Sequence, residues 1–122
     1  MATESIVRSK KAAEVIGGIL TEVMCTLFSD QIFVVVTQFG KMGTLISVTQ
    51  HNVANEIGKS TLSTKILMGK DEPLIHVYAK HLVTFVCEES GNKPVLLALA
   101  LKDANLESIK SIKQLIQSCR LW

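Results

Sequence analysis

Aromatic residues are few in this chain, and neither sign of charge is in clear excess. Only 5% of its 122 residues are aromatic, and 13 lysines and arginines stand against 11 aspartates and glutamates, a net charge of +2. A nucleic-acid-binding domain usually carries a clearly basic surface and aromatic side chains on which bases stack. The composition therefore argues against a nucleic-acid partner.

Long apolar runs and disorder-promoting residues are also scarce. The longest apolar run, Val95 to Leu101, is far shorter than the roughly twenty residues of a membrane span. Prolines number two and glycines seven, and 48% of the residues are hydrophobic, which is typical of a folded globular chain. No apolar stretch follows Met1 to Lys11 to act as a signal peptide. We expect one domain over residues 1–122, no membrane partner, and a cytoplasmic location with the nucleus as a second compartment.

Cysteine is limited to Cys25, Cys87 and Cys119. An odd number of widely spaced cysteines fits neither a disulfide framework nor a metal site. We expect Cys25 and Cys119 to lie in the core, and Cys87 to lie on the solvated half of a helix. Neither a cofactor nor a metal ion is expected.

The first half of the chain has the alternating pattern of strands. Segments 20–28, 31–38, 45–50 and 62–68 are predicted strands, with a short further one at Glu14 to Ile16. The Ser29–Asp30 pair is a turn that would join the first two strands as a hairpin. Residues 1–12 are expected to be flexible, and the polar segment 50–61 to form a mobile loop.

The second half changes to helical spacing. Asp71 is expected to cap a helix that has Pro73 in its first turn and apolar residues as far as Val86. Val95 to Leu101 fits a central strand buried on both faces, and a second helix starts at about Asn105. This order predicts an α+β fold, a mostly antiparallel sheet of about six strands with two helices on one face.

Two helices can cover only one face of such a sheet, although the strands at 31–38 and 95–101 are apolar on both faces. An uncovered apolar face of this size is unusual in a monomer. A second copy or a related chain would cover it, since sheets pack face to face at about 10 Å. We therefore expect a dimeric sandwich, with Met24, Phe33 and Val35 as candidate interface residues.

No residue pattern predicts a catalytic site. His76 and His81 would project about 140° apart on a helix, so they cannot share a metal ion. The sequence leaves open a pairing of a histidine with Cys25 or Cys87. A small dimeric enzyme, hydrolase-like and using an interface cysteine or histidine, is therefore the alternative to a binding protein.

Two segments resemble one protein family, the proteasome assembly chaperone 3 family. They are residues 34–45, Val-Val-Val-Thr-Gln-Phe-Gly-Lys-Met-Gly-Thr-Leu, and residues 71–83, Asp-Glu-Pro-Leu-Ile-His-Val-Tyr-Ala-Lys-His-Leu-Val. The resemblance continues through Val95 to Ala98 and Cys119 to Trp122. It implies a non-enzymatic chaperone of the eukaryotic proteasome core particle that binds α-type subunits while the α-ring forms.

The resemblance also implies that the chain works as a dimer, with proteasome assembly chaperone 4 as companion. In isolation, a homodimer is expected. Residues 1–13 and segment 50–61 depart from the family pattern and could touch a client protein. The candidate client contacts are His51, Asn52, Asn55 and Lys59.

Overall fold

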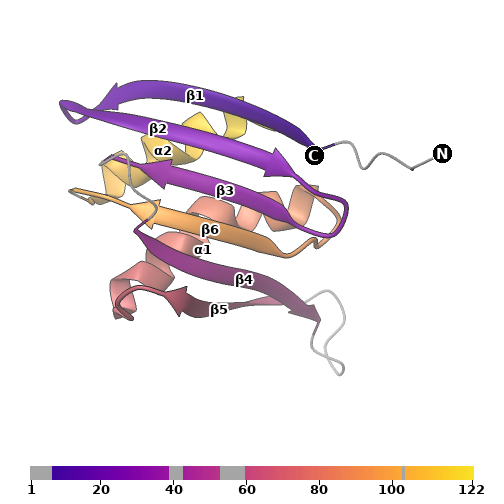
Figure 1. Ribbon diagram of the computed structural model, residues 1–122. Coiled ribbons are helices and arrows are strands. Elements are labelled where there is room, and N and C mark those ends of the chain that lie inside the picture. Colours follow the sequence, from indigo (N-terminus) through magenta and orange to yellow (C-terminus); the bar gives the residue numbers. More distant parts are fainter. Residues whose placement is uncertain (1–6, 39–42, 53–59, 103) are drawn as a thin grey trace.

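The computed structural model describes residues 7–38, 43–52, 60–102 and 104–122. Its elements follow in the order β1 (Arg8–Ile16), β2 (Ile19–Leu27), β3 (Ile32–Thr37), β4 (Thr44–Asn52), β5 (Ser60–Met68), α1 (Pro73–Glu89), β6 (Val95–Ala100) and α2 (Leu106–Ser118) (Figure 1). This succession of five strands, helix, strand and helix confirms the order predicted from the sequence.

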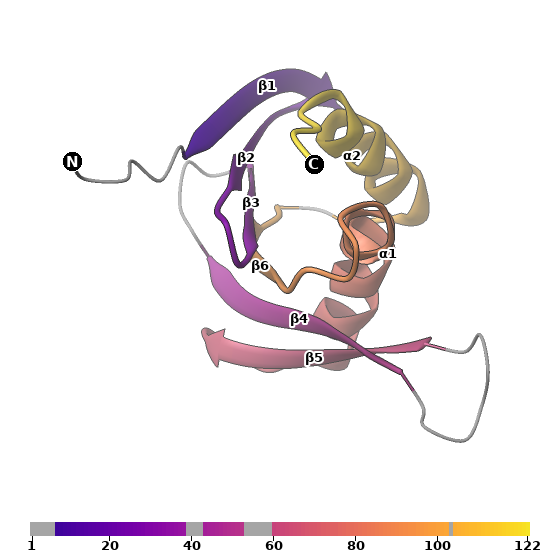
Figure 2. The same ribbon diagram turned by 90° about the vertical axis from the view of Figure 1, so that its right-hand side faces the viewer.

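All six strands belong to one sheet, in the order β1-β2-β3-β6-β4-β5. Neighbouring strands are antiparallel except for β3 and β6, which run parallel at the centre. Both helices lie on the same side of the sheet, and no described element covers the other side (Figure 2). The α+β fold with two helices on one face is confirmed, and the sheet is mixed because of its one parallel pair.

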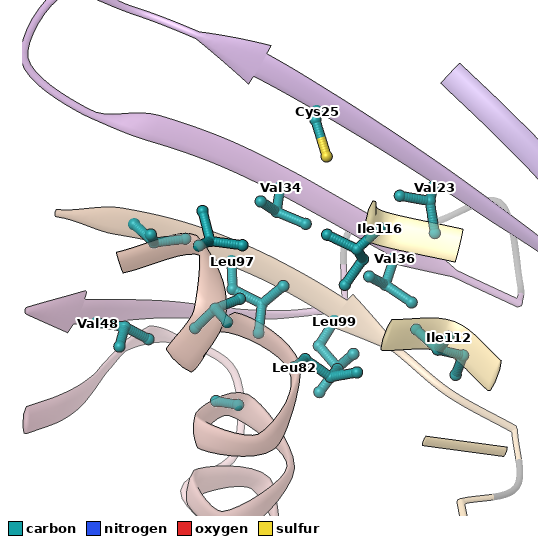
Figure 3. Packing of buried hydrophobic residues seen from close by; sticks show 14 of the residues in the cluster. Val23, Cys25, Val34, Val36, Val48, Leu82, Leu97, Leu99, Ile112 and Ile116 are labelled. Atoms are coloured by element: carbon teal, nitrogen blue, oxygen red, sulfur yellow. The ribbon is translucent and has the colours of Figure 1, made fainter. Parts of the chain in front are cut away.

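The core lies between the helices and the face of the sheet that they cover. Ile32, Val34 and Val36 of β3 are fully buried there, together with side chains from β6 and both helices (Figure 3). Full burial of such a side chain contributes about 1.5–3 kcal/mol relative to leaving it exposed. This layer therefore holds the helices on the sheet.

The start of α1 differs in detail from the prediction. Pro73 is the first helical residue, as expected, but the N-cap position is occupied by Glu72, whose side chain makes no capping hydrogen bond. Asp71 lies one residue too early to cap, and its carboxylate hydrogen-bonds to His76 instead. Leu74, expected among the apolar residues of this helix, is 60% exposed because it points away from the core.

The start of α2 confirms the prediction. Asn105 is its N-cap and accepts a hydrogen bond from the backbone N–H of Ser108. The Ser108 hydroxyl accepts in return from the backbone N–H of Asn105. Such a reciprocal pair satisfies two backbone donors that a helix start would otherwise leave unpaired.

Strands β1, β4 and β5 are longer than predicted. β1 begins at Arg8, well before the expected segment Glu14 to Ile16, so residues 8–12, expected to be flexible, pair with β2. Charged residues on both faces of this edge strand hide its period. β4 extends to Asn52 and β5 begins at Ser60, so the expected loop 50–61 is shorter at both ends. Residues 1–6 and 53–59 lie outside the described residues.

Gly43 allows the chain to enter β4 beside the end of β6. Its φ is +66°, a conformation that side chains with a Cβ rarely adopt. A Cβ at this position would clash with the carbonyl oxygen of Leu99. A glycine is therefore required where β4 approaches the β6 backbone.

Candidate protein-interaction site

The alternating side chains of β3 meet different surroundings on the two faces of the sheet. Val34 and Val36 face the helices and are fully buried. Phe33 and Val35 point to the uncovered face and are half-buried. The side chains around them therefore decide whether this face forms a continuous apolar surface.

The strand register places other apolar side chains beside these two. In β2, Met24 lies opposite Val35. In β6, Leu96 lies opposite Phe33, and Ala98 lies opposite both Val35 and Leu45 of β4. These residues form what we call the apolar patch, which comprises the half-buried Met24, Phe33, Val35, Leu45 and Leu96 together with the fully buried Ala98 between them.

The three interface residues predicted from the sequence are thus brought together, and three further members were missed. Leu45, Leu96 and Ala98 stood in predicted strands, but their place depends on β6 lying between β3 and β4. No local pattern specifies that insertion, because it joins segments far apart in the chain.

Charged residues border the apolar patch on the β1 side. Lys11 and Glu22 line a hollow of about 390 Å³ beside Met24 and Val35, with Ala13 among its lining residues. Its apolar floor and polar rim are what the centre and edge of a protein–protein contact require. A side chain of a partner sheet could occupy it.

The candidate client contacts are only partly within the described residues. His51 and Asn52 end β4, where their backbones pair with Thr61 and Ser60 of β5. Asn55 and Lys59 lie outside the described residues. The two described residues thus lie at the end of β4, away from the centre of the apolar patch.

A hydroxyl, an imidazole and a carboxylate are aligned where β5 meets α1. The Thr64 Oγ1 lies 2.6 Å from Nδ1 of His76, and the His76 Nε2 lies 2.6 Å from Oδ1 of Asp71. This array was not predicted from the sequence, because Asp71 was expected to cap the helix. Hydrolases use such a sequence of groups to activate a nucleophile.

The position of this array favours a structural role. Three hollows among the described residues are lined by other side chains, and none of them places a substrate at Thr64. The array also joins β5 to the first turn of α1, so it holds the strand and the helix together. We therefore interpret it as a clamp between strand and helix.

All three cysteines are fully buried. Burial raises the pKa of Cys25 to about 12 and that of Cys87 to about 11. The expectation that Cys87 is solvated was wrong, because its position on α1 turns toward the core. At neutral pH both thiols stay protonated, and the thiolate is the nucleophilic and metal-binding form.

The described part of the chain holds no cluster of three or more metal-ligating side chains. Among the same residues, no helix is long and apolar enough to cross a membrane. The apolar patch is an extended apolar surface on the uncovered face of the described strands. Fold and site together define a small α+β protein whose sheet presents an uncovered apolar face suited to binding another protein.

Comparison with known proteins identifies the family. A family model described as "Proteasome assembly chaperone 3" matches residues 34–119. Proteins named proteasome assembly chaperone 3 from Mus musculus and Homo sapiens are 54% and 52% identical to the chain, over 100% of both sequences in each case. A relative of the same name from Nematostella vectensis is 37% identical, over 91% of this chain and 87% of its own length. The chain belongs to the proteasome assembly chaperone 3 family.

A solved structure has the same fold at much lower sequence identity. A chain in the crystal structure of a chaperone complex for yeast 20S proteasome assembly superposes with a TM-score of 0.68. The match covers 91% of this chain and 97% of the yeast chain, at 12% identity. The two chains therefore share one fold at low sequence identity.

Proposed function

We propose that this chain is a non-enzymatic chaperone that promotes assembly of the proteasome core particle. Membership in the proteasome assembly chaperone 3 family supports this role. The apolar patch is the observation that carries the mechanism, because a binding protein needs an exposed surface that becomes buried with its partner. The cytoplasm, with the nucleus as a second compartment, is the proposed place of action.

The apolar patch is proposed as the pairing surface. A companion chain of similar fold, proteasome assembly chaperone 4, would pack its own sheet against the face that the helices leave open. Sheets stack at about 10 Å, so side chains of the size of Phe33 and Met24 can interdigitate across the contact. In the absence of the companion, a second copy would take its place as a homodimer.

The client is proposed to be an α-type proteasome subunit, bound while the α-ring forms. The β4–β5 connection, with His51, Asn52, Asn55 and Lys59, is proposed as a client contact. The polar composition of residues 51–59 supports this contact, as does the position of His51 and Asn52 at the opposite end of β4 from Leu45 of the apolar patch. One surface would hold the companion chain, while another would hold the client.

An enzymatic role is disfavoured on physical grounds. A hydrolase using Cys25 or Cys87 would need an accessible thiolate, whereas burial raises the pKa of both thiols to about 12 and about 11. Binding to a client requires neither thiol. Replacing all three cysteines with serine or alanine should therefore leave client binding intact wherever the variant folds.

Co-elution of purified proteins tests the proposal. The chain, mixed with its companion and with each α-type subunit in turn, is expected to elute in a complex with at least one subunit. The Phe33→Asp, Val35→Asp double variant should lose the companion. Failure of the folded wild-type pair to bind any α-type subunit would refute the chaperone role.

A further inference from the structure

Helices α1 and α2 lie side by side and run in the same direction over the sheet (Figure 2). Near their beginnings, the Tyr78 hydroxyl of α1 donates a 3.5 Å hydrogen bond to the carbonyl oxygen of Ala104, just before α2. Further along, the Lys113 ammonium of α2 lies 5.7 Å from the centre of the Phe85 ring of α1. Residues of the two helices therefore meet in the same order along one line.

Helical spacing places further residues along this line. Tyr78 and Phe85 are seven residues apart on α1, so residues three or four positions from either of them lie in the same row. The same spacing holds on α2 before Lys113. We call these two rows the helix seam, which comprises Leu74, Tyr78, His81 and Phe85 of α1 with Leu106, Lys110 and Lys113 of α2.

The first half of the helix seam is apolar and exposed. Leu74 and Leu106 are 60% and 61% exposed, and Tyr78 beside them is half-buried. Val77 lies within one turn of Leu74 on the outer side of α1 and is 46% exposed. Such a group of exposed apolar side chains marks a surface that another protein can cover.

The second half of the helix seam is basic. Lys110 follows Leu106 by one helical turn and is exposed. The Phe85 ring attracts the Lys113 ammonium and so holds this charge on the side of α2 that faces α1. Neither lysine has an ion pair among the described residues. His81, across from them on α1, is exposed as well.

The acidic side chains of the two helices leave this positive charge in place. Glu107 precedes Lys110 by one turn on the side of α2 away from α1, and the two form no ion pair. Glu89, at the end of α1, is engaged by Arg120. Glu88 lies beyond the last turn of the helix seam. Acidic groups of a partner would therefore be attracted to the second half.

The spacing along the helix seam favours a helical occupant. Its rows repeat once per helical turn, about 5.4 Å, and the side chains on one face of another helix repeat at the same interval. Side chains on one face of an extended segment repeat at about 6.8 Å and would drift out of step. A third helix can therefore lie along α1 and α2 with its side chains between theirs.

From these observations we propose that the helix seam is a docking site for an amphipathic helix of a partner protein, whose contacting row is apolar in one half and acidic in the other. A helix of about eleven residues, roughly 16 Å long, matches the seam. Its apolar side chains cover Leu74 and Leu106. Its carboxylates lie at Lys110 and Lys113. The helix seam and the apolar patch are on opposite sides of the sheet, so this docking does not depend on pairing.

A displayed helical library tests the chemistry of the occupant. One face of a helix in a displayed three-helix bundle is randomised, selected on the full-length chain, and counter-selected on the Leu74→Ser, Leu106→Ser double variant. We expect enrichment of rows with apolar residues at two successive turns and aspartate or glutamate at the next two. Enrichment of basic rows, of uniformly apolar rows, or of none would overturn the proposal.

The order of side chains along a selected helix tests the geometry. In a matched variant, apolar and acidic residues alternate from turn to turn at the same composition and net charge. This variant should bind at least about tenfold more weakly, because some of its carboxylates would then face Leu74 or Leu106. Equal affinity of the two helices would contradict a site with an apolar and a basic half.

Matched charge reversals locate the basic half. Lys110→Glu should weaken binding of the selected helix at least about tenfold, because like charges would then face each other. Lys80→Glu makes the same change on the other flank of α1, one turn after His76, which the hydrogen bond to Thr64 holds toward β5. This control should bind nearly as the wild-type chain does. Equal losses from both reversals would refute the assignment.

Matched apolar substitutions locate the other half. Leu106→Ser should also weaken binding at least about tenfold, because the apolar contact is lost. Leu20 of β2 is 56% exposed, similar to Leu106, and Leu20→Ser should leave binding unchanged. If the two substitutions weakened binding equally, the selected helix would not be docked on the helix seam.

Two further measurements separate this site from pairing between copies. The Phe33→Asp, Val35→Asp double variant should bind the selected helix as the wild-type chain does, whether or not the apolar patch is a pairing surface. Loss of binding in that variant would place the helix on the apolar patch and overturn the proposal. Leu106→Ser should sediment like the wild-type chain at tens of micromolar. A shift in that variant would assign the helix seam to a second copy, against the partner proposed here.

Discussion

The two faces of β3 carry nearly the same kinds of side chain but have different environments. Val34 and Val35 are neighbours in the sequence and identical in chemistry. Val34 is fully buried under the helices, whereas Val35 is half-buried in the apolar patch. Hydrophobicity alone therefore does not distinguish a core residue from an interface residue. The distinction arises from the number of helices available to cover the sheet.

The largest expected effect is the difference in stability between aspartate substitutions at these two valines. Val34→Asp places a carboxylate among apolar side chains with no partner, at a cost of about 4 kcal/mol or more. That cost is a large part of the stability of a small domain, so the variant should unfold. Val35→Asp is the matched control and should keep its fold, as followed by circular dichroism during thermal unfolding. Equal losses of stability would mean that the two faces are equally enclosed.

Pairing should be the next most sensitive property. Phe33→Asp together with Val35→Asp puts two charges at the centre of the apolar patch, and each charge needs desolvation if another sheet packs there. The dissociation constant of the homodimer should rise at least about a hundredfold, while the monomer stays folded. Sedimentation velocity at tens of micromolar measures this change. A wild-type chain that is a clean monomer at that concentration would end the self-pairing hypothesis.

Thiol labelling gives a finer comparison of the two faces. A Val35→Cys variant should be alkylated quickly at low protein concentration and slowly at tens of micromolar, where pairing covers the introduced thiol. The native Cys25, Cys87 and Cys119 should react slowly at both concentrations, because they are buried within the monomer. Labelling of the introduced thiol that does not change with concentration would argue against pairing through this face.

Alkaline pH should have the smallest effect on the free energy of unfolding. This effect should come from buried thiols on the covered side of the sheet. Burial raises the pKa of Cys25 from 9.0 to about 12, so the unfolded chain releases this proton at lower pH than the folded chain does. The free energy of unfolding should therefore be unaffected by this thiol below about pH 9 and fall between pH 9 and 12. The slope is at most about 1.4 kcal/mol per pH unit for one thiol.

Denaturant titrations at several pH values measure this slope. In Cys25→Ala, the slope should be smaller by the contribution of that thiol, while a contribution from Cys87 should remain up to about pH 11. An unchanged slope in the variant would show that the folded chain does not hold the Cys25 proton more strongly than the unfolded chain.

Much of the fold could be predicted because its signals are local. Asn105 starts α2, Pro73 starts α1, and the Ser29–Asp30 turn joins two predicted strands as an antiparallel hairpin. Each depends on a few neighbouring residues. The double-sided hydrophobicity of β3 and β6 also predicted that one face of the sheet would remain uncovered.

The remaining features depend on contacts between distant segments. β1 was predicted too short because Arg8, Lys10 and Lys11 obscure its period, and its pairing with β2 decides its length. Leu96 entered the apolar patch only because β6 lies between β3 and β4. The Thr64–His76 hydrogen bond likewise depends on how α1 meets β5. None of these contacts has a signature within one stretch of sequence.

The position of β6 also has a consequence for how the chain is made. Strands β1 to β3 form one set of local hairpins and β4 with β5 another, and the two sets are joined in the sheet only through β6. During synthesis, no strand therefore joins these two sets until residues 95–100 have left the ribosome. A chain truncated before Val95 should contain a three-stranded unit and a separate hairpin, with cooperative unfolding appearing only once β6 is present. Completion of the domain is thus timed by its last strand, late in translation.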